Sequence, residues 1–111
     1  MKYSRFVFAV AALFAQSAPA YAVSQSVNNA RITLVEPTYM PSFVAFKIDK
    51  AAGACAAGQF LKWYGSGADP SEKRDNVLAI YSAVLTAMAG GRAINLGVDD
   101  ATCSVTVFQI I

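Results

Sequence analysis

The chain contains no histidine, and this absence excludes much of the chemistry that a small protein could perform. Histidine is the usual base beside a serine or cysteine nucleophile, and it is the commonest metal ligand. Without histidine, the two cysteines, Cys55 and Cys103, do not make a zinc site. The segment Gly65–Gly67 also lacks the lysine of a phosphate-binding loop. We therefore expect no catalysis, no cofactor and no bound metal.

Adjacent carboxylates are also scarce, since Asp99–Asp100 is the only such pair in the chain. Two carboxylates can perform acid–base chemistry, and a hydrolase that uses this pair is one interpretation. Acidic residues between two apolar strands are, however, typical of a tight turn. The pattern therefore favours a turn over an active site.

An excess of basic residues is absent as well, once the N-terminal segment is set aside. Lys2 and Arg5 precede the apolar run Phe6–Ala15, and Ala20–Ala22 has the small residues of a cleavage site. This arrangement is typical of a secretory signal peptide. We predict that residues 1–22 are removed and that the protein is secreted or periplasmic.

The predicted mature chain, residues 23–111, is a single small domain whose formal charges balance. The full chain has nine basic and seven acidic residues, and Lys2 and Arg5 account for the difference. A neutral surface does not attract nucleic acid or an anionic membrane. It also lowers the solubility of a monomer, which favours a homo-oligomer.

Both cysteines lie in the mature segment, in a compartment that is oxidising if the chain is exported. We therefore predict the disulfide Cys55–Cys103. Closing a loop of this length contributes about 4 kcal/mol in the chain-entropy model. The alternative is a pair of free, buried thiols.

The clearest local signals mark a helix over Pro70–Ala89. Asp69 suits the N-cap, and proline is well tolerated at the first helical position. Glu72 lies in the first turn, where the helix dipole favours a negative charge. Gly90–Gly91 then supplies residues that commonly end a helix.

Apolar residues recur along this helix at the spacing of one buried face. The residues predicted to face the core are Val77, Leu78, Tyr81, Val84, Leu85 and Met88. The opposite face carries no charge, and Ala79, Ala83 and Ala87 form a smooth ridge along it. We predict that a second copy of the chain covers this ridge; the alternative is a featureless exposed face. The helix is too short and too polar to span a membrane, which needs about 20 apolar residues.

Alternation of apolar and polar residues predicts five strands in the rest of the chain. They cover Ala30–Val35, Ser42–Ile48, Gln59–Tyr64, Arg92–Val98 and Thr102–Ile111, after a loose lead-in over residues 23–29. In the first strand we expect Ile32 and Leu34 on one face. In the last strand we expect Val105 and Val107 on one face and Phe108 on the other. The inward residues of the middle strands are Val44, Phe46, Ile48, Leu61, Trp63, Ile94, Leu96 and Val98.

The order of these elements is three strands, one helix and two strands. It predicts a mostly β fold like the OB fold, a five-stranded curled antiparallel sheet or barrel with the helix between strands 3 and 4 and one disulfide. The alternative is an open antiparallel sheet with the helix packed on one face.

The layout of Ala30–Val35, Cys55, Val77–Gly91 and Cys103 resembles that of a group of small secreted bacterial proteins. That group in turn is similar to the binding (B) subunits of AB5 toxins, of the subtilase-cytotoxin and pertussis-like type. The resemblance implies an OB fold, pentameric rings with the helices towards a central pore, and binding of cell-surface glycans. It lies in layout and spacing, so no glycan-contacting residue is carried over to this chain.

Aromatic residues provide the candidate binding site. Tyr39, Phe43, Phe60, Trp63 and Tyr64 cluster in the first three predicted strands and their loops. Aromatic rings stack on sugars and also anchor protein interfaces. We single out Tyr39, Phe60 and Tyr64 as ligand-binding residues; the alternative, ordinary core packing, applies above all to Phe60 and Trp63.

Together these observations predict a secreted, non-catalytic binding module that recognises glycans as an oligomeric ring. The alternative is a periplasmic protein that binds or inhibits another protein.

Overall fold

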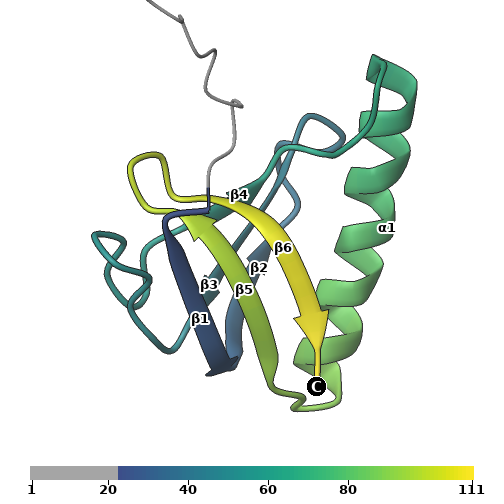
Figure 1. Ribbon diagram of the computed structural model, residues 1–111. Helices are drawn as coiled ribbons and strands as arrows, with labels where there is room; N and C mark the ends of the chain where they lie inside the picture. The colour runs from purple at the N-terminus through teal and green to yellow at the C-terminus, as the bar shows by residue number, and fades with distance from the viewer. Residues whose placement is uncertain (1–22) are drawn as a thin grey trace, which may run out of the picture.

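A computed structural model describes residues 23–111 as one helix and a curled, six-stranded sheet (Figure 1). The elements are β1 (Gln25–Ala30), β2 (Ile32–Glu36), β3 (Val44–Ile48), β4 (Leu61–Trp63), α1 (Pro70–Ala89), β5 (Ile94–Asp99) and β6 (Ser104–Ile110). The predicted signal peptide, residues 1–22, lies outside the described residues. The predicted mostly β class is therefore confirmed for the rest of the chain.

The sheet has the strand order β1-β5-β6-β4-β3-β2. Neighbouring strands are antiparallel except β4 and β6, which run parallel where Lys62 pairs with Ser104. The two strands at the ends of this order, β1 and β2, are consecutive in the chain and only Arg31 separates them. The sheet therefore curls round until its two edges meet at one bend.

The presence of β1 corrects the prediction of a loose lead-in, and it makes six strands rather than five. This strand pairs with β5 and buries only Val27 and Ala30. The register slips between these two residues, where Asn29 has a positive φ of 58°. The strand is polar because it is an edge strand with one narrow buried strip, so its sequence shows no alternation of apolar and polar residues.

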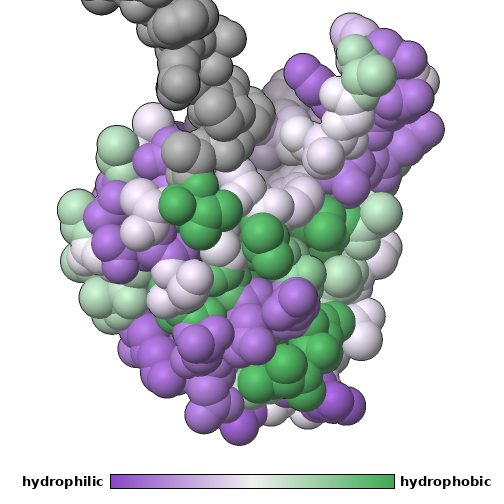
Figure 2. Space-filling model, in the orientation of Figure 1, coloured by the Kyte–Doolittle hydropathy of each residue, from purple (hydrophilic) through white to green (hydrophobic). Residues whose placement is uncertain are grey.

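The helix α1 begins and ends where the sequence predicts. The carboxylate of Asp69 accepts a hydrogen bond from the backbone amide of Glu72 (2.9 Å), and Pro70 is the first helical residue. Gly90 caps the C-terminus, and Gly91 adopts the left-handed conformation with φ of 61°. Figure 1 shows the first turns of α1 extending beyond the end of the sheet, and Figure 2 shows that these turns are mostly hydrophilic.

The helix is rotated relative to the prediction. It packs against β2, β3 and β6 through Val77, Val84 and Ala87, which are fully buried. Tyr81 is half-buried. Three residues predicted to face the core, Leu78, Leu85 and Met88, are instead 44%, 41% and 43% exposed. Among the described residues, no helix combines the length and the apolarity that crossing a membrane requires.

The core lies between the concave face of the sheet and α1. The inward residues predicted for β3, β4 and β5 are all buried: Val44, Phe46, Ile48, Leu61, Trp63, Ile94, Leu96 and Val98. Phe46, at the centre, packs edge-on against Phe108 of β6 with ring centroids 6.1 Å apart. Alternation in these strands was therefore a reliable guide to burial.

In each of the remaining strands, one irregularity separates residues that were predicted to share a face. In β6, Val98 pairs with Val105 and Gly97 pairs with Val107, so Thr106 is an extra residue. Val105 and Phe108 therefore both pack on the core while Val107 is exposed, so the prediction that Val105 and Val107 share one face is wrong. A similar shift in β2, between Ile32 and Leu34, leaves Ile32 buried but turns Leu34 outward.

The predicted disulfide Cys55–Cys103 is confirmed, and the described residues include no free cysteine. Cys55 lies in the loop between β3 and β4, and Cys103 lies in the turn between β5 and β6. The bond therefore ties this loop to the last hairpin, over 48 residues of sequence.

Candidate functional site

The convex face of β3 and β4 carries a row of aromatic rings. The two strands pair so that Val44 is opposite Trp63, which brings Phe43 and Tyr64, one residue further out, next to each other. Their ring centroids are 5.2 Å apart. Tyr39, from the β2–β3 loop, stacks on Phe43 with a centroid distance of 5.0 Å and an angle of 18° between the two ring planes. The three rings thus form one continuous apolar surface.

Two lysines lie between and beside these rings. The ammonium of Lys62 is 5.5 Å from the centroid of Phe43, and that of Lys47 is 4.5 Å from the centroid of Phe60. Both distances allow a cation–π attraction. Ala45 pairs with Lys62 and is buried.

We call Tyr39, Phe43, Phe60 and Tyr64 the aromatic face. Tyr39 is 55% exposed and Tyr64 is 37% exposed, while Phe43 and Phe60 are half-buried. The three residues predicted to bind a ligand, Tyr39, Phe60 and Tyr64, thus lie on one side of the sheet, whereas Trp63 belongs to the core. The lysines were not singled out from the sequence, although alternation along the two strands points them outward.

A pocket of about 290 Å³ opens next to this face, where the chain leaves β4 and enters α1. We call it the loop pocket; it is lined by Trp63, Tyr64, Gly65, Ser66, Gly67, Lys73, Val105 and Thr106. Tyr64 therefore belongs to both the aromatic face and the loop pocket. This pocket could not be predicted from the sequence, because it forms only where residues 63–73 meet Val105 and Thr106 of β6.

One side chain, Asn76, fixes two walls of the loop pocket. Its carbonyl oxygen accepts hydrogen bonds from the indole Nε1 of Trp63 (2.7 Å) and from the backbone amide of Ser66 (2.9 Å). Gly65 has a φ of +96°, and a Cβ at this position would lie 2.5 Å from the backbone oxygen of Lys73. The loop is thus held tightly against the first turns of α1, so the pocket is preformed.

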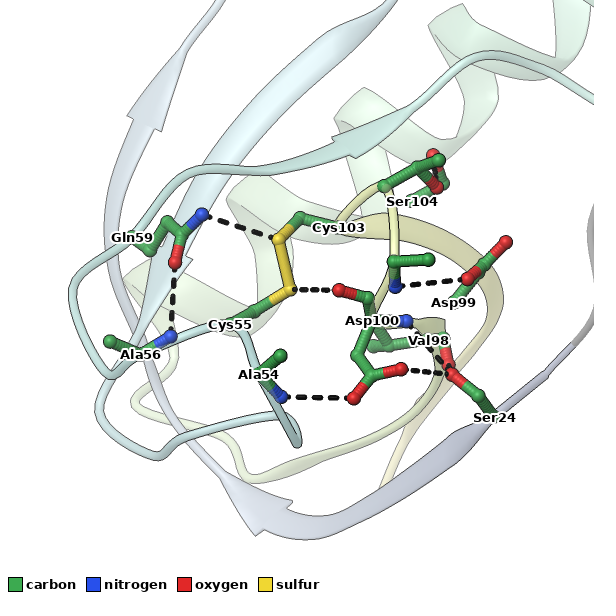
Figure 3. Close-up of a disulfide and its surroundings, with 12 residues drawn as sticks. Ser24, Ala54, Cys55, Ala56, Gln59, Val98, Asp99, Asp100, Cys103 and Ser104 are labelled. Carbon is green, nitrogen blue, oxygen red and sulfur yellow. Dashed lines mark hydrogen bonds between the residues drawn. A yellow bond between two sulfur atoms is a disulfide. The ribbon is translucent and has the colours of Figure 1, made fainter.

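The acidic pair Asp99–Asp100 lies beside the disulfide and has a structural role (Figure 3). The Asp100 carboxylate accepts hydrogen bonds from the Ser24 hydroxyl (2.6 Å) and from the Ala54 amide (2.9 Å). The backbone amide of Asp100 in turn donates to the Ser24 hydroxyl oxygen (2.9 Å). One carboxylate therefore joins the start of the sheet, the Cys55 loop and the last hairpin.

The same contacts affect the ionisation of Asp100. Hydrogen bonds from the Ser24 hydroxyl and the Ala54 amide lower the pKa of Asp100 below its usual value, because they stabilise the charged carboxylate. Asp99 instead accepts from the amide of Ala101 (3.1 Å), a hydrogen bond within the turn itself. Both carboxylates thus hold the backbone, which agrees with the interpretation of this pair as a turn.

The alanine ridge expected to meet a second copy does not lie on a single exposed face. Ala79 is exposed, Ala83 is half-buried and Ala87 is fully buried in the core of its own chain. Placing Ala87 on the outside was wrong, because the helix is rotated towards the sheet on this side. The exposed apolar side chains of α1 are Leu78, Leu85 and Met88.

Within the described part of the chain, no three acidic, cysteine or histidine residues gather where they could hold a metal ion. Comparisons with protein families, with curated proteins and with solved structures find no match to this chain.

Proposed function

We propose that this chain is a non-catalytic binding module that recognises a carbohydrate through its aromatic face. The observation that carries the proposal is the row formed by Tyr39, Phe43 and Tyr64, with Tyr39 more than half exposed. Large aromatic side chains normally bury their area, so an ordered, exposed row of rings supports a binding role. The flat C–H faces of sugar rings fit such a surface.

We further propose that the fold is of the OB type. In this interpretation β1 and β2 are the two halves of a single bent first strand, and β3, β4, β5 and β6 are strands two to five. The strand order and the position of α1 between strands three and four support it. OB folds bind oligosaccharides on the face of strands two and three and at the loop between strands one and two. Those regions correspond to β3, β4 and the loop that carries Tyr39.

We also propose that the protein is secreted or periplasmic and forms a homo-oligomer, with a ring as the arrangement that the resemblance implies. The disulfide Cys55–Cys103 is compatible with an extracytoplasmic location. The exposed Leu78, Leu85 and Met88 on a helix segment without charges support an apolar contact between copies.

Binding to another protein is the second candidate function. The exposed apolar side chains of α1 favour it, because such patches are common at protein interfaces. Stoichiometric capture of one protein from a periplasmic extract, lost in Leu85→Ala and retained in Tyr39→Ala, would support this alternative.

The proposed carbohydrate site is tested by a glycan array with the wild type, Tyr39→Ala and Tyr64→Ala. Loss of a central aromatic anchor costs 2 kcal/mol or more, so we expect each variant to bind at least about 30-fold more weakly. Val107→Ala is the control, since it removes an exposed apolar side chain of β6 that belongs neither to the aromatic face nor to the proposed contact between copies. Wild-type protein that binds no glycan, or variants that bind as well as the wild type, would contradict the proposal.

A further inference from the structure

We infer that the disulfide Cys55–Cys103 exchanges with a small external thiol at one sulfur only, the Sγ of Cys103, and that the side chain of Gln59 covers this sulfur. The inference goes beyond the proposed function, because it concerns a covalent modification site at the turn between β5 and β6. The attacking group is a thiolate, and glutathione serves as the probe.

The two sulfurs of the bond differ in how close they lie to solvent. Cys55 is 1% exposed and belongs to the core, whereas Cys103 is half-buried and follows the exposed turn residues Ala101 and Thr102. The Sγ of Cys55 also lies 3.5 Å from the carbonyl oxygen of Asp100, which closes one side of it. A thiolate therefore reaches Cys103 in the folded chain, but it reaches Cys55 only after the loop between β3 and β4 opens.

One exposed side chain, that of Gln59, lies against the Cys103 sulfur (Figure 3). Its Nε2 donates a hydrogen bond to Cys103 Sγ (3.3 Å), and its Oε1 accepts one from the backbone amide of Ala56 (3.0 Å). The glutamine amide is thus held at both of its ends. Since Gln59 is itself exposed, its contact with Cys103 Sγ places this sulfur directly beneath the surface, with the amide as its cover.

The exchange step balances without any group beyond the thiol. The thiolate sulfur bonds to Cys103 Sγ, the S–S bond breaks, and its electron pair goes to Cys55 Sγ, which takes up the proton that the thiol released. The sulfur of the external thiol is thereby oxidised and Cys55 is reduced. The carbonyl oxygen of Asp100 lies 3.5 Å from Cys55 Sγ, so the new thiol has a hydrogen-bond acceptor inside the protein.

Non-covalent contacts keep the two cysteines close together when the bond is open. The carbonyl oxygen of Cys103 accepts a hydrogen bond from the Lys62 amide of β4 (3.0 Å). The Asp100 carboxylate accepts one from the amide of Ala54, the residue before Cys55 (2.9 Å). The mixed disulfide therefore forms in the folded chain, and attack on it by the Cys55 thiolate re-forms the original bond.

The test maps the mixed disulfide on the oxidised wild type. Folded protein is treated briefly with excess reduced glutathione at neutral pH, free thiols are blocked with N-ethylmaleimide, and the chain is cut with trypsin. Cleavage after lysine and arginine separates the two cysteines into the peptides 51–62 and 93–111. By mass spectrometry we expect glutathione on Cys103 and the maleimide on Cys55. The opposite arrangement should be at least about ten-fold rarer, because it requires the loop to open first.

Two comparisons separate the burial of Cys55 from the cover on Cys103. In concentrated urea both sulfurs are exposed, so the two arrangements should become about equally frequent. Gln59→Ala removes the cover, and we expect glutathione to react roughly two- to five-fold faster, the factor that a weak hydrogen bond accounts for. Gln109→Ala is the matched control, because it removes an exposed amide near the opposite end of β6 from Cys103.

Glutathione found mainly on Cys55, or equally on both cysteines of the folded protein, would overturn the inference. A mixed disulfide that forms only in urea would overturn it too, since exchange would then require unfolding. An unchanged rate in Gln59→Ala, together with glutathione on Cys103, would refute the cover alone. Because the assay contains no saccharide, each of these outcomes is independent of the proposed carbohydrate site.

Discussion

Removing the disulfide with Cys55→Ala and Cys103→Ala together should destabilise the domain severely. The bond closes a loop with a sequence separation of 48 residues, and the loss of this constraint in the unfolded chain is worth about 4 kcal/mol. A domain of about 90 residues has a total stability of roughly 5–13 kcal/mol. The change is therefore expected to remove between a third and most of the stability.

The assay is urea unfolding at neutral pH, supported by thermal melting. For a domain of this size, a loss of about 4 kcal/mol lowers Tm by roughly 15–30 °C. Wild-type protein reduced with a thiol reagent is the matched control, because it keeps both sulfur atoms and loses only the bond between them. Since Cys55 is fully buried, the alanine variant also loses packing that the reduced protein keeps.

The two samples separate the cross-link from the packing of its atoms. If the reduced protein loses less than about 1 kcal/mol, the loop-closure argument is wrong and the hydrogen bonds of Asp100 already hold the last hairpin in place. If only the alanine variant is destabilised, the sulfur atoms act as buried side chains and not as a covalent constraint.

Asp100→Asn should lower stability at neutral pH, and the difference from the wild type should vanish as the solution is acidified. Because the pKa of Asp100 is lowered in the folded state, its charge stabilises the fold at pH values above the ordinary pKa, and this contribution is lost as pH falls through the folded-state pKa. If urea unfolding gave the same difference in stability between variant and wild type at every pH, this reasoning would be wrong. Gly53→Ala should lower the free energy of unfolding more than Gly58→Ala does. Both glycines have a positive φ, a conformation that costs alanine about 1–2 kcal/mol. Only at Gly53 would an added Cβ also clash with the Asp100 carboxylate, 2.2 Å away. Equal decreases of Tm in the two variants would disprove the clash. Val84→Ala should lower the free energy of unfolding by about 2 kcal/mol and Leu85→Ala, in dilute protein, by under 1 kcal/mol, because only Val84 is buried. Similar unfolding free energies for the two variants would show that the helix faces are wrongly assigned.

The parts of the fold that local chemistry determines could be predicted from the sequence. The Asp69 cap and the Gly90–Gly91 stop locate α1, because each acts within one helical turn. Tyr39 could be expected at the surface, since it lies in a loop bounded by two prolines. The cysteine pairing followed from the number of cysteines and the expected compartment.

The rotation of α1 could not be predicted, because periodicity does not distinguish between two adjacent apolar rows. Val77 and Val84 are seven residues apart, and so are Leu78 and Leu85. Both rows have the spacing of a buried face, and only the shape of the sheet selects the smaller valines. Small side chains allow the helix to approach the strands closely, whereas the leucines remain on its flank.

The irregularities in β2 and β6 could not be predicted from sequence patterns either. A single unpaired residue such as Thr106 moves every following side chain to the other face, and nothing in its identity marks it. The loop pocket was missed for a related reason. It depends on Asn76 reaching across to Trp63 and Ser66, a contact that only the path of the connecting loop creates.

The bend at Arg31 has a consequence for how the chain assembles. Of the six strands of the described residues, β1 is synthesised first and its partner β5 fifth, and Ser24 is 76 residues from Asp100, to which it is hydrogen-bonded. Contacts of such separation form slowly, because most of the chain must be ordered before they bring any gain. A nascent chain therefore carries β1 unpaired until β5 has been synthesised, and a protein cut before the hairpin of β5 and β6 leaves β1 without its partner strand.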